Sequence, residues 1–277
     1  MNICSSDWKI AGASVRGAAH IRSGRPNQDA VEYLPATGNG IRIVAAVSDG
    51  HGSAPHFRSS TGARLATQGA ADILAWHLDT QEDDESESTL AGEIVAHWRA
   101  AVIADIEANP LDEEDAQFSS HSAFTPYGAT LITAAANENI AILLQIGDGD
   151  LLLGYADGSV ERPLPDDDGL QGEETFSLCQ EDAGQYFRIA TMWNQNDHRW
   201  PDFMLLATDG VAKSFRDNTG FEEAVRHLRL LAHDNWEETI EALPAWLEEV
   251  SGNGSGDDST ICIAIRPGSN LLRKEKE

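Results

Sequence analysis

The order in which strands and helices are expected along this chain restricts its fold more than any other feature. Apolar runs typical of strands occupy residues 9–15 and 41–47, and apolar residues at helical spacing follow at 57–77 and 90–108. The rest of the chain is expected to add short strands, two helices and a last strand, at 130–136, 140–146, 151–155, 159–162, 187–192, 203–207, 221–232, 236–250 and 260–265. Because strands and helices do not alternate one by one, this order predicts antiparallel sheets with helices on their outer faces, an α+β layered domain.

Turns and acidic stretches separate these elements. Asn137-Glu138-Asn139 and Ala156-Asp157-Gly158 each join two strands and predict tight hairpins. Acid-rich stretches predict solvated loops at 79–87, 111–117 and 163–174. No repeat or linker divides the chain, so we expect a single domain over residues 1–266 and a flexible tail over 267–277.

The charge of the chain excludes several classes of partner. Its 277 residues include 19 Lys and Arg against 46 Asp and Glu, a formal net charge of −27. Nucleic acids and anionic membranes attract basic patches, and no Lys/Arg cluster occurs before the last residues, so we expect neither partner. The first ten residues lack a long apolar run, and the sequence lacks a stretch of about 18 apolar residues, so no secretory signal or membrane span is expected. Cys4, Cys179 and Cys262 lie far apart and fit neither a disulfide framework nor a zinc site, which favours a cytoplasmic protein.

Four aspartates stand at expected strand ends or in the turns beside them: Asp29, Asp49, Asp209 and Asp257. Loops at strand ends meet at one rim of a sheet, where several carboxylates repel one another unless cations hold them together. Oxygen ligands suit hard divalent ions, so the pattern indicates a Mg²⁺ or Mn²⁺ site. A single Asp-Gly pair is more often a plain turn, and it is the combination of the four positions that favours the site.

Six short motifs occur in an order that resembles a known family. They are Pro26-Asn27-Gln28-Asp29, Ser48-Asp49-Gly50-His51-Gly52-Ser53, Tyr127-Gly128-Ala129-Thr130-Leu131, Ile146-Gly147-Asp148, Leu206-Ala207-Thr208-Asp209-Gly210 and Gly256-Asp257-Asp258-Ser259-Thr260. In order and approximate spacing these motifs are similar to those of the metal-dependent protein phosphatases (PPM), the type 2C serine/threonine phosphatases. The resemblance covers nearly the whole chain. One motif alone would be a weak signal, whereas six in sequence are specific.

The resemblance implies a fold and a site. The fold is a four-layer α/β/β/α sandwich of two antiparallel sheets flanked by helix pairs. The site holds two ions, Mn²⁺ or Mg²⁺, with Asp49 as the carboxylate that bridges both and Gly50 as the residue that offers its carbonyl. Asp209 and Asp257 match ligands of the second ion, and Asp29 matches the acid that holds metal-bound water. A water bridging the two ions would then attack phosphorus in line.

A histidine and an arginine complete the implied site. His51 matches the histidine that protonates the departing serine or threonine oxygen, and imidazole titrates near neutral pH, as a general acid should. The family's arginine precedes the first aspartate and grips the phosphate with two hydrogen bonds. We assign this role to Arg25, with Arg22 as the alternative.

The chain also departs from the family pattern. Many members bind a third ion through the aspartate that matches Asp148 and an acid soon after the second Asp-Gly motif. At that place this chain has the basic residue Lys213, which puts a third ion in doubt unless Asp150 compensates. Asp258 stands where the family commonly has asparagine.

The expected activity is that of a cytoplasmic phosphoprotein phosphatase that acts on phosphoserine and phosphothreonine and depends on Mn²⁺ or Mg²⁺. Its partner would be a phosphorylated protein. Two alternatives stay open at this point: a catalytically silent binding or regulatory module with the same fold, and a hydrolase of small phosphate esters. Residues 163–174 and 193–202 lie between strands whose ends carry site residues, and are expected to influence substrate choice.

Overall fold

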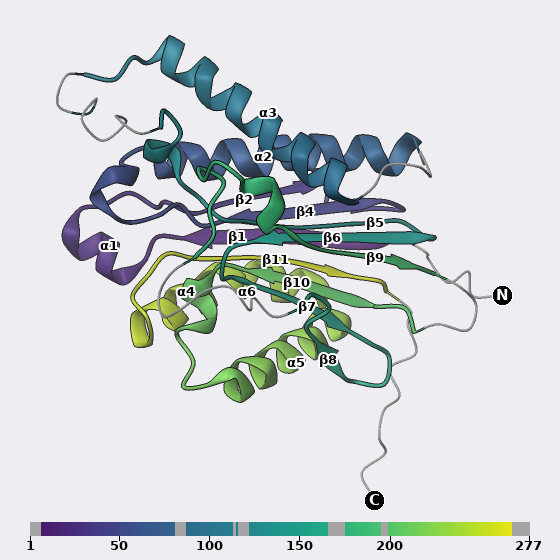
Figure 1. Cartoon of the computed structure of the whole chain (residues 1–277). Helices are drawn as coiled ribbons and strands as arrows, with labels where there is room; N and C mark the ends of the chain where they lie inside the picture. The colour runs from purple at the N-terminus through teal and green to yellow at the C-terminus, as the bar shows by residue number, and fades with distance from the viewer. Residues whose placement is uncertain are drawn as a thin grey trace, which may run out of the picture.

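The computed structural model describes residues 7–80, 87–112, 115, 122–165, 175–194 and 199–267. Two antiparallel sheets lie face to face, with two long helices on one outer side and two on the other (Figure 1). The α+β class and the four-layer α/β/β/α arrangement expected from the sequence are therefore confirmed.

Both sheets are antiparallel at every pairing between their described strands. The first has the strand order β3-β1-β11-β10-β7-β8 and the second the order β2-β4-β5-β6-β9. The first sheet comprises β1 (Trp8–Val15), β3 (Asn39–Gly40), β7 (Asp150–Gly154), β8 (Val160–Glu161), β10 (Phe203–Ala207) and β11 (Ser259–Ile265). The second comprises β2 (Ala30–Leu34), β4 (Ile43–Ser48), β5 (Leu131–Ala136), β6 (Ile140–Ile146) and β9 (Arg188–Trp193).

Helices cover the outer faces of both sheets. Helices α2 (Ser59–Thr80) and α3 (Glu87–Ala108) lie over the second sheet, and α5 (Asn218–Asp234) and α6 (Trp236–Asn253) over the first (Figure 1). Two short helices, α1 (Ala18–Ser23) and α4 (Asp209–Ala212), lie together at one end of the sheets. Single 3₁₀ turns complete the described elements at Ala54–His56, Thr125–Tyr127 and Ala183–Tyr186.

The sequence of β4 is apolar from Ile43 to Val47, and the packing on its two faces explains this. Successive side chains of a strand point to opposite faces. Val44 and Ala46 belong to the cluster beneath α2 and α3, whereas Ile43 and Val47 belong to the cluster between the two sheets. Both faces of β4 are therefore covered, and all six of its residues are buried.

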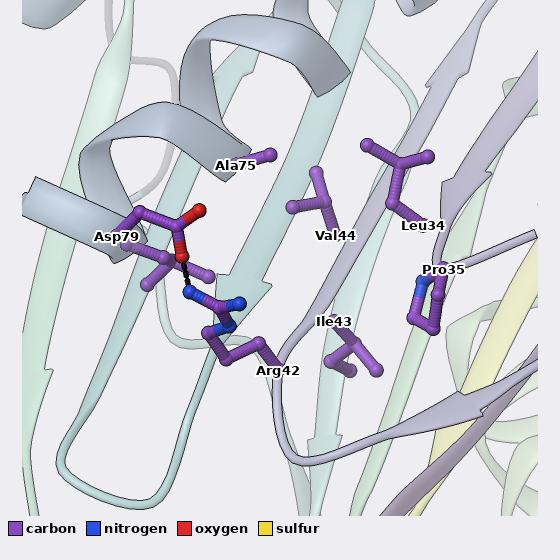
Figure 2. Close-up of a pocket in the computed structure, with 8 residues that line it drawn as sticks. Leu34, Pro35, Arg42, Ile43, Val44, Ala75 and Asp79 are labelled. Atoms are coloured by element: carbon purple, nitrogen blue, oxygen red, sulfur yellow. Dashed lines mark ion pairs between the residues drawn. The ribbon is translucent and has the colours of Figure 1, made fainter.

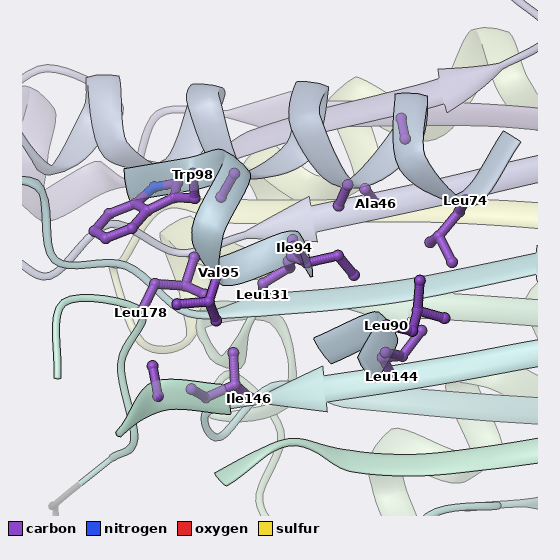
Figure 3. Packing of buried hydrophobic residues seen from close by; sticks show 14 of the residues in the cluster. Ala46, Leu74, Leu90, Ile94, Val95, Trp98, Leu131, Leu144, Ile146 and Leu178 are labelled. Atoms are coloured by element: carbon purple, nitrogen blue, oxygen red, sulfur yellow. The ribbon is translucent and has the colours of Figure 1, made fainter. Parts of the chain in front are cut away.

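The layer between the second sheet and its helices is closely packed (Figure 3). Trp98 and Ile94 of α3 and Leu74 of α2 meet Leu131 of β5 and Leu144 of β6, and all five are fully buried. Each buried aliphatic side chain of this kind stabilises the fold by about 1.5–3 kcal/mol relative to exposure. The packing fixes β4 and β5, whose ends carry site residues.

Several boundaries differ from the sequence prediction. The predicted strand 41–47 begins too early, because Ile41 is 60% exposed and stands in a bend before β4. The short elements α1, α4, β2 and β3 were not predicted, since helices of six and four residues are too short to show a helical period. The two predicted hairpins are confirmed by the pairing of β5 with β6 and of β7 with β8.

Parts of the three predicted loops, part of the segment 193–202 and nearly all of the predicted tail lie outside the described residues, which leave out 81–86, 113–114, 116–121, 166–174, 195–198 and 268–277. Cys179 and Cys262 are free thiols, and Cys4 lies outside the described part. Among the described helices, none combines the length and apolar character needed to cross a membrane.

Candidate active site

The predicted site residues meet at the end of the sheets where α1 and α4 lie. Asp49 follows β4, Asp209 follows β10 and starts α4, and Asp257 precedes β11. Together with Gly50 and His51 they line one open pocket of about 430 Å³. The other described lining residues are His20, Arg25, Gly52, Ser53, His56, Asp148, Thr175 and Lys213.

The backbone around Asp49 is held by the neighbouring strand. The Asp49 amide donates to Thr130 Oγ1 over 3.1 Å, and the Thr130 amide donates to the Asp49 carbonyl over 2.8 Å. Gly50 is buried, and a Cβ placed on it would lie 2.6 Å from the Gln28 carbonyl oxygen. Only glycine fits at this close approach of two backbone segments, which explains the Asp-Gly pair at this turn.

Asp29 does not line the pocket but lies beside it, directly before β2. Thr208 Oγ1 donates to Asp29 Oδ2 over 2.7 Å. Burial raises the pKa of Asp29 to about 8, against the lowering effect of hydrogen bonds from Thr208 and Thr260. The carboxylate is thus placed where it is costly to charge unless a cation is near.

The carboxylates at this end of the sheets crowd one another. Burial raises the pKa of Asp49 well above its usual range, and the charges of Asp29, Asp209, Asp257 and Asp148 raise it further. Burial and the charge of Asp148 also raise the pKa of Asp209. Oxygen donors arranged in this way suit hard divalent ions, whose charge would relieve the repulsion, so the residues fit Mn²⁺ or Mg²⁺.

His51 faces the same pocket. Its amide donates to the Gly128 carbonyl over 3.0 Å, and its ring meets the ring of His56 edge to face at 4.9 Å. Burial, followed by the charge of His56, lowers the pKa of His51 to about 4. The charge of Asp148 raises the pKa of His51 but does not outweigh these two effects, so the imidazole is neutral at pH 7 unless a further anion binds beside it.

The two candidate arginines, Arg25 and Arg22, lie at different places relative to the pocket. Arg25 lines the pocket, and one of its terminal nitrogens donates to the Gly52 carbonyl over 3.1 Å. Arg22 lies beside Gly256, and its nitrogen Nη2 is 3.7 Å from where a Cβ on that glycine would be. Of the described pocket-lining residues, Arg25 is the arginine that can reach a ligand in the pocket.

Lys213 lies between two of the acids. Its Nζ forms ion pairs with Asp209 and, at 3.5 Å, with Asp148. Asp150, the expected substitute at a third ion, instead accepts a hydrogen bond of 2.9 Å from Arg162. The residues around Asp148 therefore do not form an all-acid set, and they do not fit a third divalent ion.

Two features of the site were not predicted: the presence of His20 in the pocket and the hydrogen bonds that Asp258 accepts. Asp258 Oδ1 accepts the Gly17 amide over 2.7 Å, and its Oδ2 accepts the Gln28 amide over 2.7 Å. The same Oδ2 lies 2.8 Å from Nδ1 of His20, a residue of α1. The sequence gives no signal for this contact, because the partners lie more than 200 positions apart and α1 has no recognisable period.

A second pocket, of about 230 Å³, lies between the C-terminal end of α2 and the strands β2 and β4 (Figure 2). Its walls are mostly apolar, with Leu34, Ile43 and Val44 among them, and Arg42 pairs with Asp79 at its edge. The charged residues that line this second pocket, Arg42 and Asp79, neutralise each other, whereas several acids converge in the first pocket. The first, acidic pocket is therefore the better candidate for the active site.

The layered fold and the pocket at the strand ends together define an α/β/β/α protein with a cluster of acids that fits divalent cations. Residues 16–248 match the family protein phosphatase 2C, and the chain belongs to this family. No curated protein sequence matches the chain.

Solved structures with the same fold come from distant relatives. The serine/threonine phosphatase PstP/Ppp of Mycobacterium tuberculosis superposes with a TM-score of 0.58 at 19% identity, over 94% of this chain and 99% of that one. PppA, a regulatory component of the type VI secretion system in Pseudomonas aeruginosa, gives a TM-score of 0.58 at 19% identity, over 93% and 97%. A sex-determining protein of C. elegans gives 0.59 at 13% identity, over 95% of this chain and 66% of that one. At these identities the likeness establishes the fold alone.

Proposed function

We propose that this chain is a serine/threonine phosphoprotein phosphatase that depends on Mn²⁺ or Mg²⁺ and acts in the cytoplasm. The single observation that carries the proposal is the convergence of Asp49, Asp209 and Asp257 in one pocket, with Asp29 beside it. Membership in the protein phosphatase 2C family supports the reaction class. The catalytic domain of PstP has been solved with two manganese ions, which supports two ions here.

In this proposal each acid has its own part in holding the ions. Asp49 would be a ligand of both ions, and the Gly50 carbonyl would be a further oxygen ligand at the same turn. Asp209 and Asp257 would hold the second ion, and Asp29, whose carboxylate Thr208 orients, would hold water at the pocket. When bound, the ions supply positive charge and lower the pKa of a water that serves as nucleophile.

Arg25 and His51 act on the substrate. Arg25 faces the pocket with its guanidinium, which pairs with phosphate oxygens and holds the group in place. His51 donates a proton to the leaving serine or threonine oxygen. A bound phosphate dianion favours the charged imidazole, and so raises the fraction of His51 that is protonated.

The proposal is tested by phosphate release from phosphoserine and phosphothreonine peptides, measured with Mn²⁺ and again after chelation by EDTA. We expect release that requires the metal. A panel of small phosphate esters runs beside the peptides, and much faster release from these esters would contradict the protein substrate. Absence of release from every substrate, with metal bound, would favour the alternative of a binding module.

A further inference from the structure

We propose that Nε2 of His20 binds one of the divalent ions beside Asp257, and that this nitrogen ligand makes the site prefer Mn²⁺ to Mg²⁺. The inference rests on the proposed function, because it needs an ion in the acidic pocket. It adds a ligand outside the set of carboxylates that the sequence predicts.

The orientation of the His20 ring is fixed by Asp258. His20 is 9% exposed and Asp258 is 3% exposed, and Nδ1 of the ring lies 2.8 Å from Oδ2 of the carboxylate. An ionised carboxylate only accepts hydrogen bonds, so Nδ1 carries the proton and donates it. In the neutral ring the lone pair then sits on Nε2.

Asp258 is held by three hydrogen-bond contacts within the protein. Its Oδ1 accepts the Gly17 amide, and its Oδ2 accepts the Gln28 amide together with the His20 ring. His20, Asp257 and Asp258 form a cluster whose ligand atoms lie within 4.8 Å of one another. Asp258 thus already accepts three hydrogen bonds from the protein, whereas the carboxylate of Asp257 accepts the Asp258 amide at Oδ1, so Nε2 of His20 and the carboxylate of Asp257 are the ligand atoms of this cluster best placed to bind an ion.

The distance between these two atoms suits neighbouring ligands of one ion. Nε2 of His20 lies 3.5 Å from Oδ1 of Asp257. Two atoms that each bind an ion at about 2.1 Å, at angles of roughly 90–115°, lie about 3.0–3.5 Å apart. His20 also lines the same pocket as Asp49 and Asp209. A carboxylate that receives the other ring N–H is a common support for a metal-binding histidine.

Close packing holds His20 in this position. The Ala19 amide donates to the Gly256 carbonyl over 2.7 Å, and a Cβ on Gly17 would lie 2.3 Å from the carbonyl carbon of Asp257. Helix α1 and the turn before β11 are therefore in direct backbone contact. The backbone segments that carry His20 and Asp257 are thus held against each other at the edge of the pocket.

A nitrogen ligand changes which ion is preferred. Mg²⁺ favours oxygen ligands and retains several waters, whereas imidazole suits transition metals. Mn²⁺ accepts both types of ligand, so His20 favours Mn²⁺ over Mg²⁺ at the ion that Asp257 holds.

The test uses the full chain without a histidine tag, loaded with Mn²⁺ and examined by pulsed EPR for coupling to a ligand nitrogen. The main variant is His20→Asn, whose amide nitrogen replaces Nδ1 and keeps the bond to Asp258 but does not extend to the position of Nε2. His51→Gln is the control, because His51 lines the same pocket and is not expected to bind the ion. Melting temperature and Mn²⁺ and Mg²⁺ affinities are measured on all three proteins.

We expect nitrogen coupling in the wild type and in His51→Gln, and its loss in His20→Asn at an unchanged melting temperature. The ratio of the Mg²⁺ to the Mn²⁺ dissociation constant should fall about tenfold or more in His20→Asn. Bound Mn²⁺ and metal-dependent phosphate release without nitrogen coupling, or with coupling that persists in His20→Asn, would overturn this inference and leave the proposed function standing. Failure of the wild type to bind Mn²⁺ would overturn both.

Discussion

The hydroxyl of Thr208 donates to Oδ2 of Asp29 over 2.7 Å and joins two residues that lie 179 positions apart in the sequence. Thr208 follows β10 of the first sheet, and Asp29 precedes β2 of the second. The same hydroxyl oxygen accepts the amide of Thr260 over 3.1 Å. One side chain thus couples the turns of both sheets at the candidate active site.

Replacement of Thr208 by valine is expected to weaken both the site and the fold. The change keeps the shape of the side chain but removes the donor to Asp29 and leaves the buried Thr260 amide without that acceptor. A lost bond to a charged group costs about 1.5–3 kcal/mol, so Mn²⁺ affinity should fall about tenfold or more. Thr208→Ser keeps the hydroxyl and serves as the control. Equal Mn²⁺ affinities for the two variants, measured by calorimetry, would contradict the assignment.

Asp258→Asn is expected to lower the free energy of unfolding by about 1–3 kcal/mol. Both carboxylate oxygens accept hydrogen bonds from N–H groups, and an amide NH₂ in place of one oxygen would face a donor. The neighbouring Asp257→Asn is the matched control, because the amide of Asp258 still finds an acceptor on the side chain at 257. Chemical denaturation of both variants measures the difference. If Asp258→Asn were as stable as the wild type, asparagine would satisfy the amides of Gly17 and Gln28 and the His20 ring as well as aspartate does.

Lys213→Met is expected to tighten Mn²⁺ binding about two- to fivefold, without raising the number of ions bound. The ammonium pairs with Asp209 and Asp148 and competes with an ion for the Asp209 carboxylate. The Lys213 side chain is 61% exposed, and a solvent-exposed ion pair is worth about 0.2–1 kcal/mol, which sets the size of the effect. Titration calorimetry gives both the affinity and the stoichiometry. Weaker binding in the variant would mean that Lys213 supports the ions.

Asp202 and Arg229 form a buried ion pair beneath α5, with bonds of 2.9 and 2.7 Å. Burial acts to raise the pKa of Asp202, but the neighbouring His233 and Arg229 outweigh it and lower the pKa. A lowered folded-state pKa stabilises the fold above the unfolded-state pKa of about 3.9, and this contribution disappears as the pH falls through the folded-state pKa.

Breaking this pair by Asp202→Asn should cost about 3–5 kcal/mol at pH 7, because Arg229 is left buried without its partner. The difference in unfolding free energy between wild type and variant should shrink as the pH falls below about 4. Denaturation at pH 7, 5 and 3 measures it. If the difference in unfolding free energy stayed constant from pH 7 to pH 3, the charge of Asp202 could not be its cause.

The sequence was most informative where a local pattern decides the structure. The turn between β5 and β6 is an example: Oδ1 of Asn137 accepts the amides of Asn139 and Ile140, so the residues that form the turn are themselves the signal. The turns carrying Asp49, Asp209 and Asp257 follow or precede strongly apolar strands, and the structure brings them into one pocket as expected.

Contacts between distant segments could not be predicted in this way. His20 reaches Asp258 across the fold, and the six residues of α1 leave no periodic signal of their position. The basic character of Lys213 was visible in the sequence, but its ion pairs with Asp148 and Asp209 depend on how the turn after β6 meets α4. Such contacts are set by the stacking of the sheets.

The most direct test of the central claim is the rate of phosphate release from a phosphothreonine peptide by wild type and Asp49→Asn, at saturating Mn²⁺ and matched folded fractions. Because Asp49 is the carboxylate proposed to contact both ions, we predict metal-dependent release by the wild type and a loss of at least about a thousandfold, roughly 4 kcal/mol in activation free energy, in the variant. A variant that retains the wild-type rate would contradict the account of a two-ion phosphatase centred on Asp49.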